Sequence, residues 1–121
     1  MNIENNGPVV TFTASAAINR KCRVKLTGDG TVGPAGAGEE SIGVSQDAVA
    51  ASGDLVQVLM WGHDRITKVA ASKAIAVNTA IYGAAAGQVS DAASGNAIGK
   101  SLHAATAAGD EIPVLWKGYE A

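Results

Sequence analysis

Hydrophobic and polar residues alternate in several short segments of this chain. In residues 22–26, Cys-Arg-Val-Lys-Leu, three apolar side chains share one face: Cys22, Val24 and Leu26. Residues 9–14, Val-Val-Thr-Phe-Thr-Ala, are rich in β-branched and aromatic side chains. Both patterns are typical of strands in a half-buried sheet. We therefore expect the apolar face of residues 22–26 to point into a core, and Arg23 and Lys25 to face solvent.

The second half of the chain repeats the order of the first. A set of residues recurs at a constant spacing of 56 positions, and in the first half its members are Ile42, Gly43, Ser45, Ala48, Ala51, Gly53, Asp54, Val58, Leu59 and Gly62. Upstream the match continues at a spacing of 57, as in Gly30 with Gly87. A tandem duplication with one insertion or deletion is the simplest account. We expect a flexible arm at residues 1–8, then a single β domain over residues 9–121 with repeat units at about 17–64 and 74–120.

Each predicted unit closes on the same hairpin, with a Ser-Gly-Asp or Ala-Gly-Asp turn before its last strand. Gly53 and Gly109 can adopt positive φ without steric cost, and Asp54 and Asp110 can accept backbone N–H bonds as the chain reverses. All four are predicted structural turn residues. Pro113 falls inside the last strand and predicts an edge strand or a bulge there, because proline donates no ladder hydrogen bond. Many short strands between Gly, Ala and Ser turns indicate an all-β fold, a small β-barrel or a compact β-sandwich.

Composition and charge narrow the class of function. The net charge of −2 and the isoelectric point of 5.5 argue against a nucleic-acid-binding protein. No run approaches the roughly 20 apolar residues that span a bilayer, and the first residues lack the pattern of a signal peptide. We therefore expect neither membrane nor nucleic-acid contact. A core built largely from Ala and Gly gains little free energy per ordered residue, which predicts an oligomer.

Candidate catalytic and cofactor-binding patterns are weak. Residues 28–33 fit the G-x-G-x-x-G pattern, but the Pro34 segment that follows cannot begin a helix, so we interpret them as an extended flexible loop. His63 and His103 lack a third ligand at metal spacing. No G-x-S-x-G elbow occurs, and Cys22, the one cysteine, predicts a buried small side chain. We predict no enzyme activity, no cofactor and no metal, unless distant residues assemble a site in space.

Four of the nine basic residues gather in one segment: Arg20, Lys21, Arg23 and Lys25. Their equivalents in the second unit are uncharged. One interpretation is a solvated strand face that protects a sheet edge. The other is a surface that docks on an acidic protein.

Large aromatic side chains are few, and three of them are candidates for contacts between subunits: Trp61, Trp116 and Phe12. Trp61 and Trp116 occupy nearly equivalent strand ends. Aromatic side chains at such places serve either a core or an interface hot spot. Replacement by alanine separates the two roles, because an interface residue dissociates the oligomer without unfolding its subunits.

The order of these segments resembles the small capsid decoration, or cement, proteins of tailed bacteriophages. The resemblance rests on Val-Thr-Phe-Thr-Ala at 10–14, Ile-Gly-Val at 42–44 followed by Ala-x-x-Gly-Asp-x-Val, Asn-Ala-Ile-Gly at 96–99 and the closing Ala-Ala-Gly-Asp at 107–110. It spans the chain from about Val9 onward. Each motif alone is a general turn or strand signal, so the order and spacing carry the likeness.

The resemblance implies a β-rich virion protein, made in the host cytoplasm, that assembles on the outside of the mature head and stabilises it. Its expected partners are the major capsid protein, whose neighbouring subunits it would bridge, and copies of itself in a homotrimer. The basic segment then supplies the capsid-docking candidates. The alternative is a tail- or head-associated adhesive or carbohydrate-binding β module, which a glycan screen run beside a capsid-binding assay would distinguish.

Overall fold

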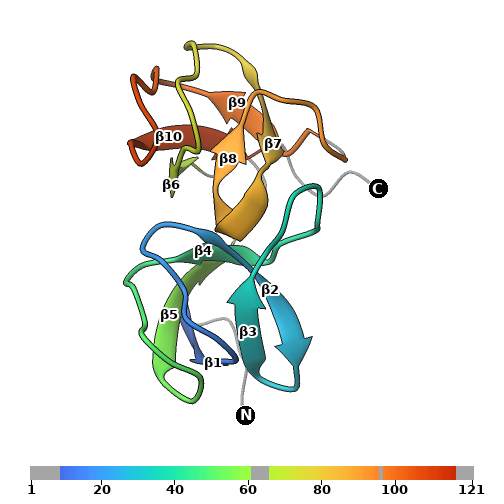
Figure 1. The fold of residues 1–121 in the computed structure, drawn as a ribbon, viewed down its shortest axis with the longest axis vertical. Helices are drawn as coiled ribbons and strands as arrows, with labels where there is room; N and C mark the ends of the chain where they lie inside the picture. The colour runs from blue at the N-terminus through green and yellow to red at the C-terminus, as the bar shows by residue number, and fades with distance from the viewer. Residues whose placement is uncertain (1–8, 61–65, 96, 117–121) are drawn as a thin grey trace.

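The computed structural model describes residues 9–60, 66–95 and 97–116, except the side chain of Trp116. The predicted arm at residues 1–8 and Trp61 therefore lie outside the described residues. Two five-stranded units are stacked along the long axis of the molecule (Figure 1). We call residues 9–60 the first unit and residues 66–116 the second unit. The all-β prediction is confirmed: the one helical segment described is a single 3-10 turn, η1, at Ala85–Gly87.

The first unit is a closed barrel with the strand order β1-β3-β2-β4-β5. Its strands are β1 (Val9–Ala14), β2 (Arg23–Gly28), β3 (Thr31–Pro34), β4 (Gly43–Ser45) and β5 (Leu55–Met60). Strand β1 pairs in parallel with β3 and antiparallel with β5, and these two pairings close the barrel. Alternate residues of the strands point inward and form a core of Phe12, Ala14, Val24, Val32, Val56 and Val58, which Ile18 completes from the segment between β1 and β2.

The second unit is a five-stranded sheet with the order β6-β10-β9-β7-β8. Its strands are β6 (Ile66–Ala70), β7 (Ala80–Gly83), β8 (Val89–Ser90), β9 (Gly99–Ser101) and β10 (Glu111–Trp116). Its strand pairing follows that of the barrel at a spacing of 56 or 57 residues. The parallel pair Ala14↔Val32, for example, has its counterpart in the parallel bridge Ala71↔Val89. Duplicated sequence segments thus occupy corresponding places, while the unit boundaries remain a prediction.

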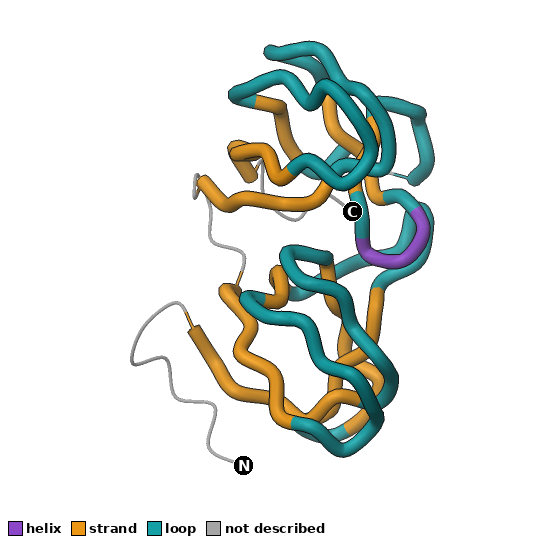
Figure 2. The backbone as a smooth tube through the Cα atoms, turned by 60° about the vertical axis from the view of Figure 1, so that its left-hand side comes forward, coloured by secondary structure: helices purple, strands orange, loops and turns teal. Residues whose placement is uncertain are grey.

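The two units touch through backbone and side chains. The N–H of Gly87 donates to the carbonyl of Ala35 at 2.7 Å, and the N–H of Ala70 donates to the carbonyl of Lys21 at 2.8 Å. Val44, on the outer side of the barrel, is fully buried and belongs to the core cluster of the second unit. Figure 2 shows the turn containing η1 at this junction, between the two lobes. One outer face of the barrel is therefore an interior surface.

Strand β10 corrects the expectation for Pro113. This strand lies between β6 and β9, so it is not an edge, and its register with β6 runs without a shift, Pro113 opposite Lys68. The carbonyl of Pro113 accepts the N–H of Leu102, just beyond the last residue of β9. In an antiparallel ladder the N–H and C=O of one residue point to the same side. The side of Pro113 that lacks an N–H therefore faces Leu102, beyond the last residue of β9. For this reason the central strand β10 tolerates a proline at this position.

The glycine-rich segment at residues 28–33 is also corrected. It forms the tight turn between β2 and β3, with Gly30 at φ 69°, and the residues that follow are paired strand. The expected extended loop is wrong because Thr31–Pro34 pair with β2, and Thr31 and Val32 pair with β1 as well. The interpretation of Cys22 as a buried small side chain is confirmed, since it is a free thiol about 1% exposed, and this burial raises its pKa.

Candidate functional site

Three of the four basic candidates hold partners within the chain at the surface. Arg20 Nε donates to Glu111 Oε2 at 3.0 Å, and this ion pair joins the two units. Lys25 Nζ donates to both carboxylate oxygens of Glu39, at 2.8 and 2.9 Å, and this bond is the largest of the causes that lower the pKa of Glu39. Lys21 Nζ donates to the side-chain carbonyl of Gln46 at 2.8 Å.

The fourth candidate, Arg23, is fully buried. Its guanidinium lies in the junction between the units and donates to five backbone carbonyls, those of Ala35, Gly36, Glu39, Ala84 and Gln88, at 2.7 to 3.4 Å. Burial lowers the pKa of Arg23 to about 10, so the group remains charged at neutral pH. Carbonyl oxygens from both units compensate for the lost hydration.

The expected orientation of residues 22–26 is therefore wrong at two positions. Arg23 does point away from the barrel core, but the second unit covers that face. Leu26, expected inside, is 54% exposed, because β4 pairs with Arg23 and Val24 only and β2 extends past it. Arg23 thus has no free surface with which to dock a partner. Arg20, Lys21 and Lys25 remain the exposed or half-buried members of the predicted docking segment.

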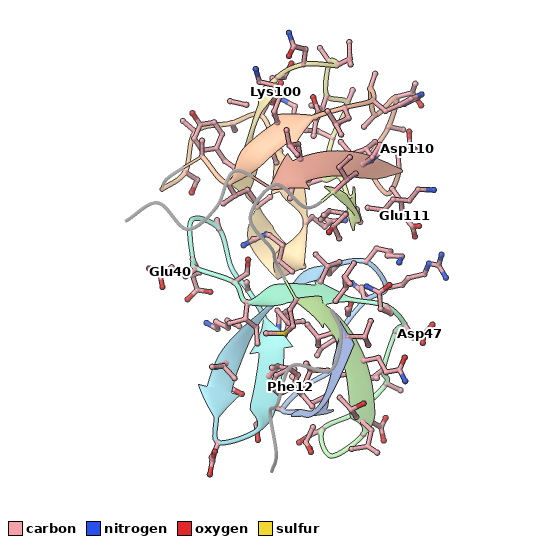
Figure 3. The ribbon with its side chains drawn as sticks, turned by 180° about the vertical axis from the view of Figure 1, so that it is seen from behind. Phe12, Glu40, Asp47, Lys100, Asp110 and Glu111 are labelled. Carbon is pink, nitrogen blue, oxygen red and sulfur yellow. The ribbon has the colours of Figure 1, made fainter. Side chains whose placement is uncertain are left out.

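Of the three aromatic candidates for subunit contacts, one is buried and two have side chains outside the described residues. Phe12 is about 1% exposed and packs in the barrel core, so its predicted place in a subunit contact is wrong. Figure 3 shows Phe12 inside the first lobe. Trp116 ends β10, but its side chain, like the whole of Trp61, lies outside the described residues. The interface roles of the two tryptophans remain predictions.

The two Gly-Asp turns have matching geometry. Gly53 and Gly109 adopt φ of 95° and 94°, and their N–H groups donate to Ala14 and Ala71 respectively, each at 2.8 Å. The carboxylates differ in their hydrogen bonds. Within the described part of the chain, the Asp54 carboxylate accepts one bond, from the N–H of Ala51 at 3.3 Å. Asp110 accepts the N–H and the hydroxyl of Thr106, each at 2.8 Å, and the N–H of Ala107 at 3.3 Å.

These bonds predict a pH-dependent stability. They lower the pKa of Asp110 in the folded chain, chiefly through the N–H of Thr106, so the ionised carboxylate stabilises the fold above the pKa of the unfolded chain. This contribution is lost as pH falls through the lowered pKa, below about pH 4. We expect Asp110→Asn to lower the midpoint of thermal unfolding by about 2–5 °C at pH 7, and the difference from the unmodified chain to close in acid. Thermal melts followed by circular dichroism from pH 7 to pH 2 measure it.

Asp54→Asn is the matched control, because its carboxylate accepts a single long hydrogen bond in the corresponding turn. Its effect should be the smaller of the two at pH 7. Equal effects of the two substitutions, or a difference for Asp110→Asn that persists unchanged at pH 2, would contradict the prediction.

Metal-ligating and catalytic groups do not converge in the described residues. No group of three or more His, Cys, Asp or Glu side chains is close enough there to hold a metal ion. His103 is exposed, with Nδ1 at 2.9 Å from the carbonyl of Ala104, and His63 lies outside the described ranges. An open surface hollow of about 440 Å³ is lined by Lys25, Leu26, Glu39, Glu40 and Ile42. Its wall carries both signs of charge and resembles a surface for protein contact more than a reaction site.

Sequence analysis missed a set of large apolar side chains that the fold leaves exposed. Leu26, Leu55 and Val77 are 54%, 70% and 55% exposed. A signal was present in the repeat, because Val77 stands where the first unit has Arg20, and Leu55 stands where the second unit has Glu111. Positions at which one unit is apolar and the other charged mark surfaces that the two units use differently.

Two stacked five-stranded units define the chain as a small all-β module with two sheets. A family model described as phage cement protein matches residues 4–116, and the chain belongs to this family. The family is a structural, typically non-enzymatic one, and membership supports a role in capsid decoration.

A solved structure agrees on the fold. The chain is similar to the crystal structure of the head fiber gp8.5 N base in bacteriophage phi29, with a TM-score of 0.74 and 19% sequence identity over 89% of this chain and 92% of that one. At this identity the likeness describes the fold alone. No curated protein matches the chain. Within the described residues, no helix has the length and hydropathy needed to cross a bilayer.

Proposed function

We propose that the chain binds the outer surface of the mature phage head and stabilises it by bridging neighbouring major capsid subunits. The family match over residues 4–116 is the observation that carries this proposal. The fold similarity to the base of a phage head fiber supports it, since that protein is also a component of a phage head. The head exterior is the corresponding location, after synthesis in the host cytoplasm.

The stabilisation follows from mass action. A ligand that binds only the assembled shell shifts the equilibrium away from dissociated subunits, by an amount that grows with its concentration relative to its Kd. A homotrimer would multiply the effect, because the second and third contacts form at high effective concentration. Binding after maturation follows if the docking surface exists only on the expanded shell. The decorated shell then resists the pressure of packaged DNA.

Electrostatic docking is assigned to Arg20, Lys21 and Lys25. The two ion pairs in this segment are solvent-exposed, and exposed pairs contribute only about 0–1 kcal/mol each. Their cations can therefore exchange an intramolecular carboxylate for one on the capsid at little cost. Such surface charges mainly increase the association rate and its dependence on salt.

Co-sedimentation with phage heads that lack the chain tests this proposal. We expect saturable binding to expanded heads and none to unexpanded heads, with a bound ratio that reports the position on the lattice. Arg20→Gln combined with Lys25→Gln should weaken binding about three- to tenfold and flatten its salt dependence. Lys73→Gln is the control, since Lys73 forms an ion pair of the same kind with Asp91, at 3.1 Å, on the second unit.

Absence of binding to either form of the head would contradict the proposed function. In that case a glycan array probed with the same protein tests the adhesive alternative. Equal binding to expanded and unexpanded heads would contradict the maturation step alone. Equal losses in the docking variant and the Lys73→Gln control would contradict the assignment of docking to the basic segment.

A further inference from the structure

The junction between the two units is built from complementary side chains. Arg20 of the first unit pairs with Glu111 of the second at 3.0 Å. Arg23 packs against Gly83, where an added Cβ would lie 2.7 Å from the guanidinium carbon. The first contact pairs two opposite charges. In the second, the large side chain of Arg23 occupies the space that is left because Gly83 has no side chain. Together with the buried Val44, they define how one unit of this kind docks on another.

Each of these positions has a counterpart in the other unit, and the counterparts are exposed or lie in exposed segments. At the spacing of 57, Arg20 and Arg23 correspond to Val77 and Ala80, both exposed. Glu111 and Gly83 correspond, at the spacings of 56 and 57, to Leu55 and Leu26. The sequence repeat therefore gives each unit a free surface that corresponds to one side of the junction. Val77 and Ala80 lie on the surface of the second unit, and Leu26 and Leu55 lie on the surface of the first.

The changes at the counterparts are complementary in the two side-chain pairs, whereas the buried Val44 corresponds, at the spacing of 56, to the exposed and charged Lys100. The ion pair Arg20 with Glu111 becomes an apolar pair, Val77 with Leu55. The pair of Arg23 with Gly83 becomes Ala80 with Leu26, in which the large side chain has moved to the opposite partner. Paired changes that preserve fit are expected where the two surfaces meet.

The two surfaces lie at opposite ends of the molecule. The turn between β2 and β3 and the start of β5 lie at the lower end in Figure 1, whereas the loop leading into β7 and strand β9 lie at the upper end. We call Leu26, Asp29 and Leu55 the first-unit end, and Val77, Ala80 and Lys100 the second-unit face. All six residues are exposed, and all except Ala80 are large apolar or charged. Asp29 on one surface and Lys100 on the other give them opposite charge.

We infer that the first-unit end of one copy docks on the second-unit face of another copy, in the manner in which the two units dock within the chain. The ligand of this surface is thus a second copy of the chain. The inference goes beyond capsid binding, because it concerns a contact between copies that forms in the absence of any shell. The two surfaces differ, so the interface is heterologous and each associated pair retains one free surface of each kind. Association therefore continues past the dimer unless a ring closes.

Sedimentation velocity of the full chain over a concentration series, without heads, tests the inference. The unmodified chain should form species larger than a dimer as concentration rises. Leu55→Glu sets a lone carboxylate against Val77, and Val77→Arg sets a lone guanidinium against Leu55. Each single variant should raise the Kd of self-association at least tenfold, because an unpaired charge is desolvated in the contact.

The most specific test is whether a second substitution restores the association that the first one weakens. A chain carrying both L55E and V77R rebuilds the ion pair found between Arg20 and Glu111, and its Kd should return to within about threefold of the original. Mixing the two single variants should also restore association that neither shows alone. Ile66→Glu is the matched control, since Ile66 is 58% exposed but lies on neither surface. Circular dichroism of each variant verifies that it is folded.

Three results would overturn the inference. They are a chain that remains monomeric at every concentration, a control variant that weakens association as much as L55E, and a mixture of single variants that fails to associate. None of them bears on binding to heads, so the inference fails separately from the proposed capsid binding; a chain that stays monomeric would contradict the homotrimer as well.

Discussion

Replacement of Arg23 by alanine is expected to lower the free energy of unfolding by about 3–5 kcal/mol, one of the largest effects of any single substitution in this chain. The guanidinium supplies hydrogen bonds to five carbonyls, two of them in the second unit, at Ala84 and Gln88. Its removal leaves buried acceptors without partners and a cavity in the junction. Urea denaturation followed by circular dichroism measures the loss. Lysine should recover only part of it, because an ammonium has three donors and no planar fork.

Arg20→Ala is the control for this prediction. Arg20 is three residues away and also joins the two units, but its ion pair is exposed and screened by solvent, so the loss should be much smaller than for Arg23→Ala. An Arg23→Ala variant that loses no more than the control would show that the buried guanidinium does not hold the units together.

Phe12→Ala should lower the free energy of unfolding by about 3–5 kcal/mol, because it removes a large buried side chain from a small core. The barrel core around Phe12 consists mainly of valine and alanine, which cannot fill the space of a lost ring. The chain should therefore unfold at lower denaturant without a change in its self-association while it remains folded. Urea denaturation and sedimentation of the same samples separate these two effects.

Val9→Ala is the matched control on the same strand, since Val9 is 44% exposed. Its effect on stability should stay within about 0.5 kcal/mol. Dissociation of a Phe12→Ala oligomer whose subunits keep their stability would instead restore Phe12 as an interface residue.

Much of the fold could be predicted because each unit is specified by local signals. Alternation identified a strand at residues 22–26, β-branched and aromatic composition identified one at residues 9–14, and the Gly-Asp turns marked the closing hairpins. Residue order and spacing also indicated the family. Strand alternation is a local property, and it survives in these segments because each strand has one face in a core.

The candidate site was harder to predict, since alternation shows which residues share a face and not what covers that face. Arg23 lies on the outer side of its own barrel, as its place in the pattern indicates. The second unit then packs on that side, and this packing depends on Gly83 and Gly87, some 60 residues away. Leu26 is exposed for a related reason, because β2 extends past β4, which pairs with Arg23 and Val24 only. No local pattern contains contacts between segments that are remote in sequence.

The junction also gives the chain a direction. The two similar units are joined through different surfaces, so no twofold axis relates them and the molecule is polar, with two different ends. In any regular layer that is attached through one of these ends, every molecule must have the same orientation. The outward surface of such a layer would be uniform in chemistry across the whole particle, whatever the number of copies.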